Sequence, residues 1–109
     1  MISSTTLLNR KGDLAMVHVL VRLKTGDFEK WKVGFEAASG LRKTYGSKGV
    51  RAFRNADKPD EILVLGEYEN IEKAKQMFAS QEFREAVKNA GISSPPTVTF
   101  LDQVHQLPN

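Results

Sequence analysis

Apolar and polar positions alternate along the chain in a way that predicts the order strand, helix, strand, strand, helix, strand. Residues 15–23 read Ala-Met-Val-His-Val-Leu-Val-Arg-Leu and are apolar on both alternating faces, which is typical of a strand covered on both sides. Asp27 then suits a helix N-cap, and apolar side chains recur three and four positions apart from Phe28 towards Tyr45. Gly46 is expected to end this first helix.

The second half of the chain predicts a hairpin, a helix and a last strand. Residues 50–55 and 61–68 alternate as strands around a loop rich in turn formers. Asn70 is expected to cap a second helix, which Ser80 restarts and Gly91 closes. After the prolines at 95 and 96, residues 97–101 form the final strand.

This order of elements predicts an α+β protein with the ferredoxin-like βαββαβ fold, in which two helices cover one face of a four-stranded antiparallel sheet. The other face would be open. Apolar residues remain on it whichever face the helices take, for example Met16 and Leu20 on the first strand. A contiguous apolar face of this kind indicates a partner interface, so we expect a homodimer with stacked sheets.

The composition fits a single domain. The chain has 109 residues, of which 40% are hydrophobic and 27% charged. Residues 1–14 are mostly polar and are expected to be a flexible N-terminal tail, followed by one domain over residues 15–109. No apolar run approaches the ~20 residues of a membrane span. The chain lacks cysteine, which excludes disulfides and fits a cytoplasmic protein.

Several classes of partner are not expected. The net charge of +3 is spread among acidic residues, as on solvated helix faces, so nucleic acid is not an expected partner. RNA recognition modules share this strand order, but residues 61–68 lack their aromatic stacking pattern. No His or carboxylate pair has metal-ligand spacing, and residues 46–49 are too short for a phosphate-binding loop, so we expect no metal and no cofactor.

Polar and aromatic side chains on the strands and at the helix ends supply the candidate site. His18 is a possible general base or phenol partner, and a hydrogen-bonded interface residue in the alternative reading. Arg22 can bind a carboxylate or oxyanion, but an ion pair with Glu67 or Glu69 on a neighbouring strand is the stronger expectation.

Further candidates combine packing and binding roles. Tyr45 and Tyr68 end a helix and a strand, where a phenol can line a pocket mouth, but interfacial packing is the stronger expectation for both. Arg54 and Asn55 face opposite sides of their strand, so at most one of them points into a given cavity. Trp31 lies on the apolar stripe of the first helix, where a tryptophan is usually part of the core.

The motifs Val21-Arg22, Asp-Phe-Glu-Lys-Trp-Lys (27–32), Leu-Arg-Lys (41–43), Gly-Ser-Lys-Gly (46–49), Phe-Arg-Asn (53–55) and Ala-Gly-Ile (90–92) occur in that order. With them, residues 16–104 resemble the dimeric α/β barrel superfamily, and within it the small antibiotic biosynthesis monooxygenase-like, or cyclase-like, domains. The resemblance implies a pocket between the helices and the sheet, near a dimer interface. It also implies that Trp31 corresponds to a tryptophan common on the first helix.

Relatives of this kind include oxygenases that need no cofactor, because their electron-rich aromatic substrates supply the electrons to oxygen. Haem-degrading relatives use a histidine on the second helix, and residues 71–90 contain none, so haem is not expected. The resemblance favours a small cofactor-independent oxygenase-like protein acting on an aromatic or polyketide-like small molecule, with His18 and Trp31 as catalytic candidates. The alternative is a non-catalytic dimeric domain that binds a small hydrophobic ligand or regulates a partner. The residues do not decide whether the chain is an enzyme.

Overall fold

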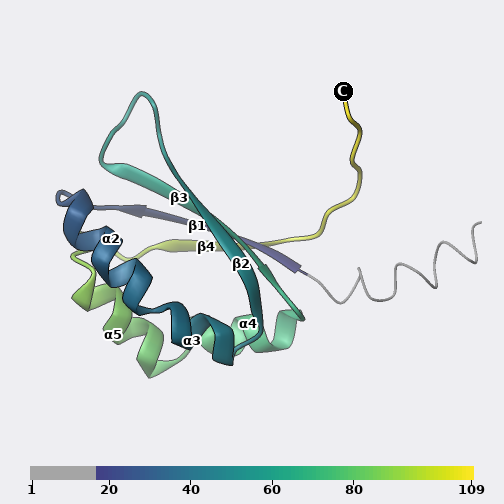
Figure 1. Cartoon of the computed structure of the whole chain (residues 1–109), viewed down its shortest axis with the longest axis horizontal. Coiled ribbons are helices and arrows are strands. Elements are labelled where there is room, and N and C mark those ends of the chain that lie inside the picture. Colours follow the sequence, from purple (N-terminus) through teal and green to yellow (C-terminus); the bar gives the residue numbers. More distant parts are fainter. Residues whose placement is uncertain (1–16) are drawn as a thin grey trace, which may run out of the picture.

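The computed structural model describes residues 17–109, so the predicted tail over residues 1–14 lies outside the described part. The strands and helices follow the predicted order (Figure 1). They are β1 (Val17–Lys24), α2 (Phe28–Ala37), α3 (Ser39–Thr44), β2 (Ser47–Arg54), β3 (Glu61–Tyr68), α4 (Ile71–Phe78), α5 (Gln81–Asn89) and β4 (Thr97–Leu101). The ferredoxin-like α+β fold is therefore confirmed. No helix within residues 17–109 combines the length and the apolar character needed to cross a bilayer.

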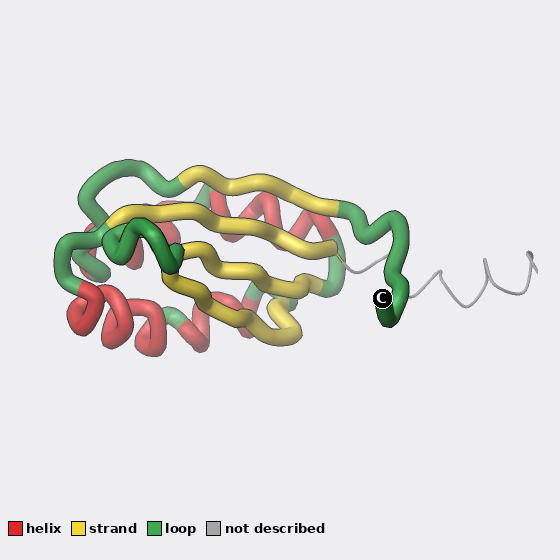
Figure 2. Tube along the Cα trace, turned by 90° about the horizontal axis from the view of Figure 1, so that it is seen from above, coloured by secondary structure: helices red, strands yellow, loops and turns green. Residues whose placement is uncertain are grey.

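The sheet has the strand order β2-β3-β1-β4, and all its neighbours are antiparallel. The central pair is β1 with β3, in a register that sets Leu20 opposite Leu65 and Val17 opposite Tyr68. All four helical segments lie on one side of this sheet, as the views in Figure 1 and Figure 2 agree. Within residues 17–109, no helix lies on the other face.

The burial pattern along β1 shows which face the helices cover. Val17, Val19 and Leu23 are buried beneath them, with at most 6% of each residue exposed. Leu20 and Arg22 point to the opposite face, where Leu20 is half-buried and Arg22 is exposed. The prediction that residues 15–23 are covered on both faces therefore holds for one face only over the described part, residues 17–23. Leu20, Leu63 and Leu65 on the open face are half-buried within the single chain, and Phe53 beside them is exposed.

The predicted helix N-caps are confirmed, but the first helix is not continuous as predicted. The side chains of Asp27, Asn70 and Ser80 each accept a hydrogen bond from the backbone N–H three residues on, as N-caps do. The first helix, expected to run without a break to Tyr45, is interrupted at Ala38 between α2 and α3. The second segment begins with Ser39 and Gly40, which have low helix propensity.

β2 begins earlier than predicted. Gly46 has a φ of 90° and ends α3, but pairing with β3 starts at the next residue, Ser47, instead of Val50. The register shifts between Ser47 and Gly49, and Gly49 has a φ of 150°. A bulge of this type admits one extra residue into a strand, which is why the glycine-rich stretch is strand rather than turn.

Candidate functional site

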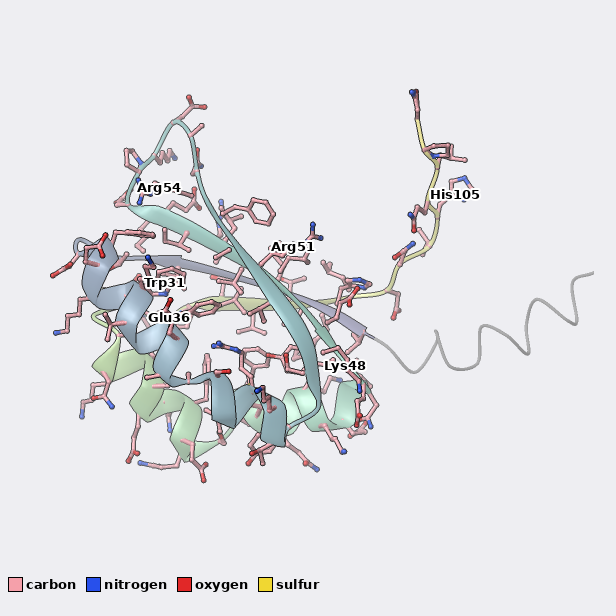
Figure 3. The ribbon with its side chains drawn as sticks, viewed as in Figure 1. Trp31, Glu36, Lys48, Arg51, Arg54 and His105 are labelled. Carbon is pink, nitrogen blue, oxygen red and sulfur yellow. The ribbon has the colours of Figure 1, made fainter. Side chains whose placement is uncertain are left out.

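An apolar cavity of about 80 Å³ lies between the helices and the covered face of the sheet. β1 and β3 form its floor through Val19, Val21 and Val64, and α2 contributes Trp31, whose side chain points from the helix towards the sheet (Figure 3). Its remaining wall includes aromatic side chains from α2, α4 and α5: Phe35, Phe78 and Phe83. The described wall of the cavity is therefore mostly aliphatic and aromatic.

Aromatic side chains at helical spacing form a continuous stack along α2. The ring centroids of Phe28 and Trp31 are 5.7 Å apart, and those of Trp31 and Phe35 are 4.8 Å apart with nearly parallel planes. Only 3% of Trp31 is exposed. Trp31 is thus both a core residue and a cavity wall, so the two readings that the sequence left open are compatible.

Tyr68, at the end of β3, presents its phenol to the same cavity. The residue is 2% exposed, and its hydroxyl donates to the Met77 sulfur at 3.9 Å, a weak acceptor. Burial raises the pKa of Tyr68 to about 12, although the positive charge of Arg42 acts in the opposite direction. Tyr68 is therefore a neutral hydrogen-bond donor near pH 7, and not a proton acceptor.

Arg42 was not singled out as a site residue from the sequence. It is half-buried in α3, it is the charged side chain among the described residues that line the cavity, and its guanidinium carbon lies 4.1 Å from the centroid of the Phe35 ring. Burial lowers the pKa of Arg42, but an arginine remains protonated at neutral pH. Its spacing of seven residues from Phe35, on the apolar stripe of the first helix, is the signal that could have identified it.

The structure places three predicted site residues on the open face, away from the cavity. His18 Nε2 lies 3.1 Å from Oε2 of Glu67. The expectation that Arg22 pairs with Glu67 or Glu69 is wrong, because its Nε donates to Oε2 of Glu61 instead. Asn55 donates to the other oxygen of the same carboxylate at 2.6 Å.

Glu61 therefore receives two hydrogen bonds while only 5% exposed. The amide of Asn55, followed by the guanidinium of Arg22, lowers the pKa of this carboxyl. Sequence reasoning missed Glu61, since it looked like the polar start of a strand. Its burial depends on partners from β1 and from the end of β2 (Asn55), which only the sheet register brings together.

The last two predicted site residues lie beside the cavity without lining it. Arg54 is exposed near the start of α2, with its guanidinium carbon 4.2 Å from the centroid of the Phe28 ring (Figure 3). Arg54 thus contacts the helix side while Asn55 bonds on the open face, so the two side chains diverge as alternation predicts. Tyr45 packs against the buried cluster that contains Tyr68. Within residues 17–109, no three His, Cys, Asp or Glu side chains gather as metal ligands would.

Comparison with known proteins gives structural but not sequence relatives. No family model and no curated protein sequence matches the chain. Among solved structures, an antibiotic biosynthesis monooxygenase-type protein from Bordetella bronchiseptica has a TM-score of 0.71 at 18% identity, covering 84% of this chain and 99% of its own. A similarly named protein from Caulobacter crescentus CB15 has a TM-score of 0.67 at 17% identity, covering 91% and 99%.

SnoaB, a cofactor-independent oxygenase from Streptomyces nogalater, is also similar in fold. A structure of a SnoaB mutant has a TM-score of 0.69 at 13% identity, covering 87% of this chain and 99% of SnoaB. Likenesses at this level of identity are likenesses of fold. The chain has the fold of the antibiotic biosynthesis monooxygenase-like domains, as the sequence motifs implied.

Proposed function

We propose that this chain is a small cofactor-independent oxygenase-like protein that acts on an aromatic or polyketide-like small molecule. The observation that carries the proposal is the apolar cavity between sheet and helices, walled by stacked Trp31 and Phe35 and by the phenol of Tyr68. The fold shared with SnoaB supports it. Trp31 and Tyr68 would orient the aromatic rings and exclude water.

The proposed reaction balances without a further reductant. An activated CH₂ group of the substrate reacts with O₂, one oxygen atom becomes the new carbonyl, and the other leaves as water with both hydrogens. The substrate supplies all four electrons that reduce O₂. The protein would contribute binding and a dry, ordered environment, with the N–H of Trp31 and the O–H of Tyr68 as hydrogen-bond donors to a developing oxyanion.

The alternative is a dimeric domain that binds such a molecule without chemistry. One observation favours it: among the described residues, the cavity wall contains no His, Asp, Glu or Lys that could accept a proton from the substrate. His18, the predicted base, lies on the other face of the sheet and pairs with Glu67. An enzyme with this cavity would have to bind a substrate that is already ionised.

Oxygen consumption distinguishes the two functions. The wild-type protein is tested with a panel of hydroquinones and anthrones, beside Trp31→Ala, Trp31→Phe and Tyr68→Phe. Arg84→Gln, on the exposed side of α5, is the control. Because Trp31→Ala removes a buried ring at a cost of about 3–5 kcal/mol, circular dichroism must first show that it folds.

The oxygenase function predicts uptake by wild type and Arg84→Gln above the uncatalysed rate, and a loss of uptake in Trp31→Ala. Tyr68→Phe should lower kcat by removing one donor to the oxyanion. No uptake with any member of the panel would contradict the oxygenase function and favour ligand binding without chemistry.

We infer further that two copies pair through the open face of the sheet. Leu20, Leu63 and Leu65 are half-buried there, beside Phe53, which is 51% exposed. A contiguous apolar surface of this kind is typical of an interface. The pairing would leave the cavity, on the opposite face, free to take a ligand.

A further inference from the structure

Arg42 brings a positive charge to a cavity wall that is otherwise uncharged and mostly apolar among the described residues. The side chain is half-buried, so its guanidinium has lost part of its hydration. Such a group is normally compensated by a carboxylate or by several hydrogen bonds. The contacts around Arg42 therefore decide whether the charge has a partner within the chain.

Within residues 17–109, no such partner is found. The ion pairs there join Arg22 to Glu61, His18 to Glu67, and Lys48 and Lys73 to Glu69. The face of the Phe35 ring, at 4.1 Å, is the contact that compensates the Arg42 charge. A ring face leaves the N–H donors at the edge of the guanidinium available to an acceptor in the same plane.

Arg54 is a natural comparison, because it is stacked in the same manner on the Phe28 ring at 4.2 Å. Arg54 is exposed and does not line the cavity. Stacking on phenylalanine thus needs neither burial nor a cavity, and does not by itself account for the position of Arg42.

The second polar group of the wall is also a donor. Among the described residues, the Tyr68 hydroxyl donates only to the Met77 sulfur, and it stays protonated because burial raises its pKa to about 12. Both polar groups of the wall, the guanidinium and the phenol, are hydrogen-bond donors. A ligand that complements them carries a hydrogen-bond acceptor with high electron density. The cavity wall offers none among its described residues except carbonyl groups and sulfur.

We propose that Arg42 selects ligands whose aromatic body fills the cavity and whose anionic oxygen, from a carboxylate or a phenolate, pairs with the guanidinium. This inference rests on the proposed function, since it specifies the chemical class of the molecule that the cavity takes. It makes Arg42 a specificity-determining residue, and a ligand that binds there as a phenolate would enter already ionised, as a cavity without a base requires.

The test compares probes of one shape and different charge. Equilibrium dialysis at pH 7.5 measures Kd for 2-naphthoate and for neutral 2-naphthylmethanol with wild type, Arg42→Met, Arg42→Lys and the stacking control Arg54→Met. We expect wild type to bind the acid about tenfold or more tightly than the alcohol, as a charge-assisted pair implies. Arg42→Met should remove that preference without weakening alcohol binding, Arg42→Lys should keep part of it, and Arg54→Met should keep all of it.

The absorbance of 4-nitrophenolate distinguishes the two sources of the charge. A rise in phenolate absorbance on adding wild type, but not Arg42→Met, identifies phenolate as a group that Arg42 holds. If wild type binds 2-naphthoate more tightly than 2-naphthylmethanol but does not raise the 4-nitrophenolate absorbance, the anionic group of the ligand is a carboxylate.

Equal affinity of wild type for acid and alcohol would overturn the inference on Arg42 and leave the aromatic cavity standing. An equal loss for both probes in Arg42→Met would also overturn it, because the residue would then be structural. No saturable binding of either naphthyl probe would overturn the proposed function together with the inference.

Discussion

Arg22 and Glu61 form an ion pair of 2.5 Å across the open face of the sheet, with only 7% of the Glu61 side chain exposed. We predict that Glu61→Gln lowers the free energy of unfolding by more than Glu69→Gln does. A glutamine cannot accept both charge-assisted hydrogen bonds, and it leaves Arg22 without a partner. Glu69 is 40% exposed and pairs only with surface lysines, so its pairs are worth little. Urea denaturation at pH 7 measures both; equal losses would contradict the prediction.

Acid should weaken the protein partly through the same carboxyl. Asn55 and then Arg22 hold the pKa of Glu61 below its usual value of 4.5. Because the unfolded chain takes up the proton more readily, this stabilisation is fully present above pH 4.5 and is lost as the pH falls further. The pH dependence of stability below 4.5 should be shallower in Glu61→Gln than in wild type. Some dependence should remain, since the pKa of Glu69 is also lowered, chiefly by Lys73. Identical profiles would show that Glu61 is not coupled to folding.

Tyr68 should limit stability at the alkaline end. Its pKa is raised from 10.0 to about 12 by burial, so the unfolded chain loses this proton first. The contribution is fully present below pH 10 and declines by roughly 2–3 kcal/mol as the pH rises to 12. Tyr68→Phe should remove that decline, and should cost less than about 1 kcal/mol at pH 7 because the hydroxyl meets only a weak acceptor. Denaturation at pH 8 to 12 tests both values, and an undiminished alkaline decline in the variant would refute the assignment.

Two helical glycines should respond oppositely to alanine. A Cβ on Gly34 would lie 2.8 Å from Cβ of Ala90, where α2 packs on α5, so Gly34→Ala should destabilise by about 1–2 kcal/mol despite its better helix propensity. A Cβ on Gly40 would meet nothing within 4 Å, so Gly40→Ala should stabilise by about 0.5–1 kcal/mol. Thermal unfolding of the two variants provides the measurement. A stabilised Gly34→Ala would mean that α2 and α5 can separate.

The open face should control association. We expect a dimer at micromolar concentration by sedimentation, and a folded monomer for Phe53→Glu, because the charge would be buried between stacked sheets. Val33 is a matched control, since it is 66% exposed on α2, away from that face. Val33→Glu should leave the dimer intact. A wild-type monomer at that concentration would refute the interface.

The features that could be predicted from the sequence are those set by residues close together in the chain. The side-chain caps of Asp27, Asn70 and Ser80, and the strand over residues 97–101, follow from residue chemistry and alternation. Two of the predicted site residues, Trp31 and Tyr68, do line the cavity. Trp31 lies on the apolar stripe of a helix, whose buried side was clear, whereas the strand that ends at Tyr68 is apolar on both faces and its buried side was not.

The remaining features depend on contacts between distant segments. β1 is apolar on both faces, so alternation grouped His18 with Arg22 but did not show which face the helices would cover. Arg42 resembled a solvated charge because its burial depends on Phe35 and on the cavity wall that it shares with residues of the sheet. Glu61 became a buried acceptor only through the meeting of Arg22 and Asn55.

The bulge in β2 distorts an edge strand of the sheet. β2 and β4 are the outer strands of the sheet, where unpaired backbone groups can recruit strands of other chains. Along the edge strand β2, the register shift between Ser47 and Gly49 interrupts regular pairing, and Lys48 and Arg51 add positive charge. The other edge strand, β4, spans five residues and follows two prolines. Straightening β2 would therefore open a route to fibre-like growth even with the core intact.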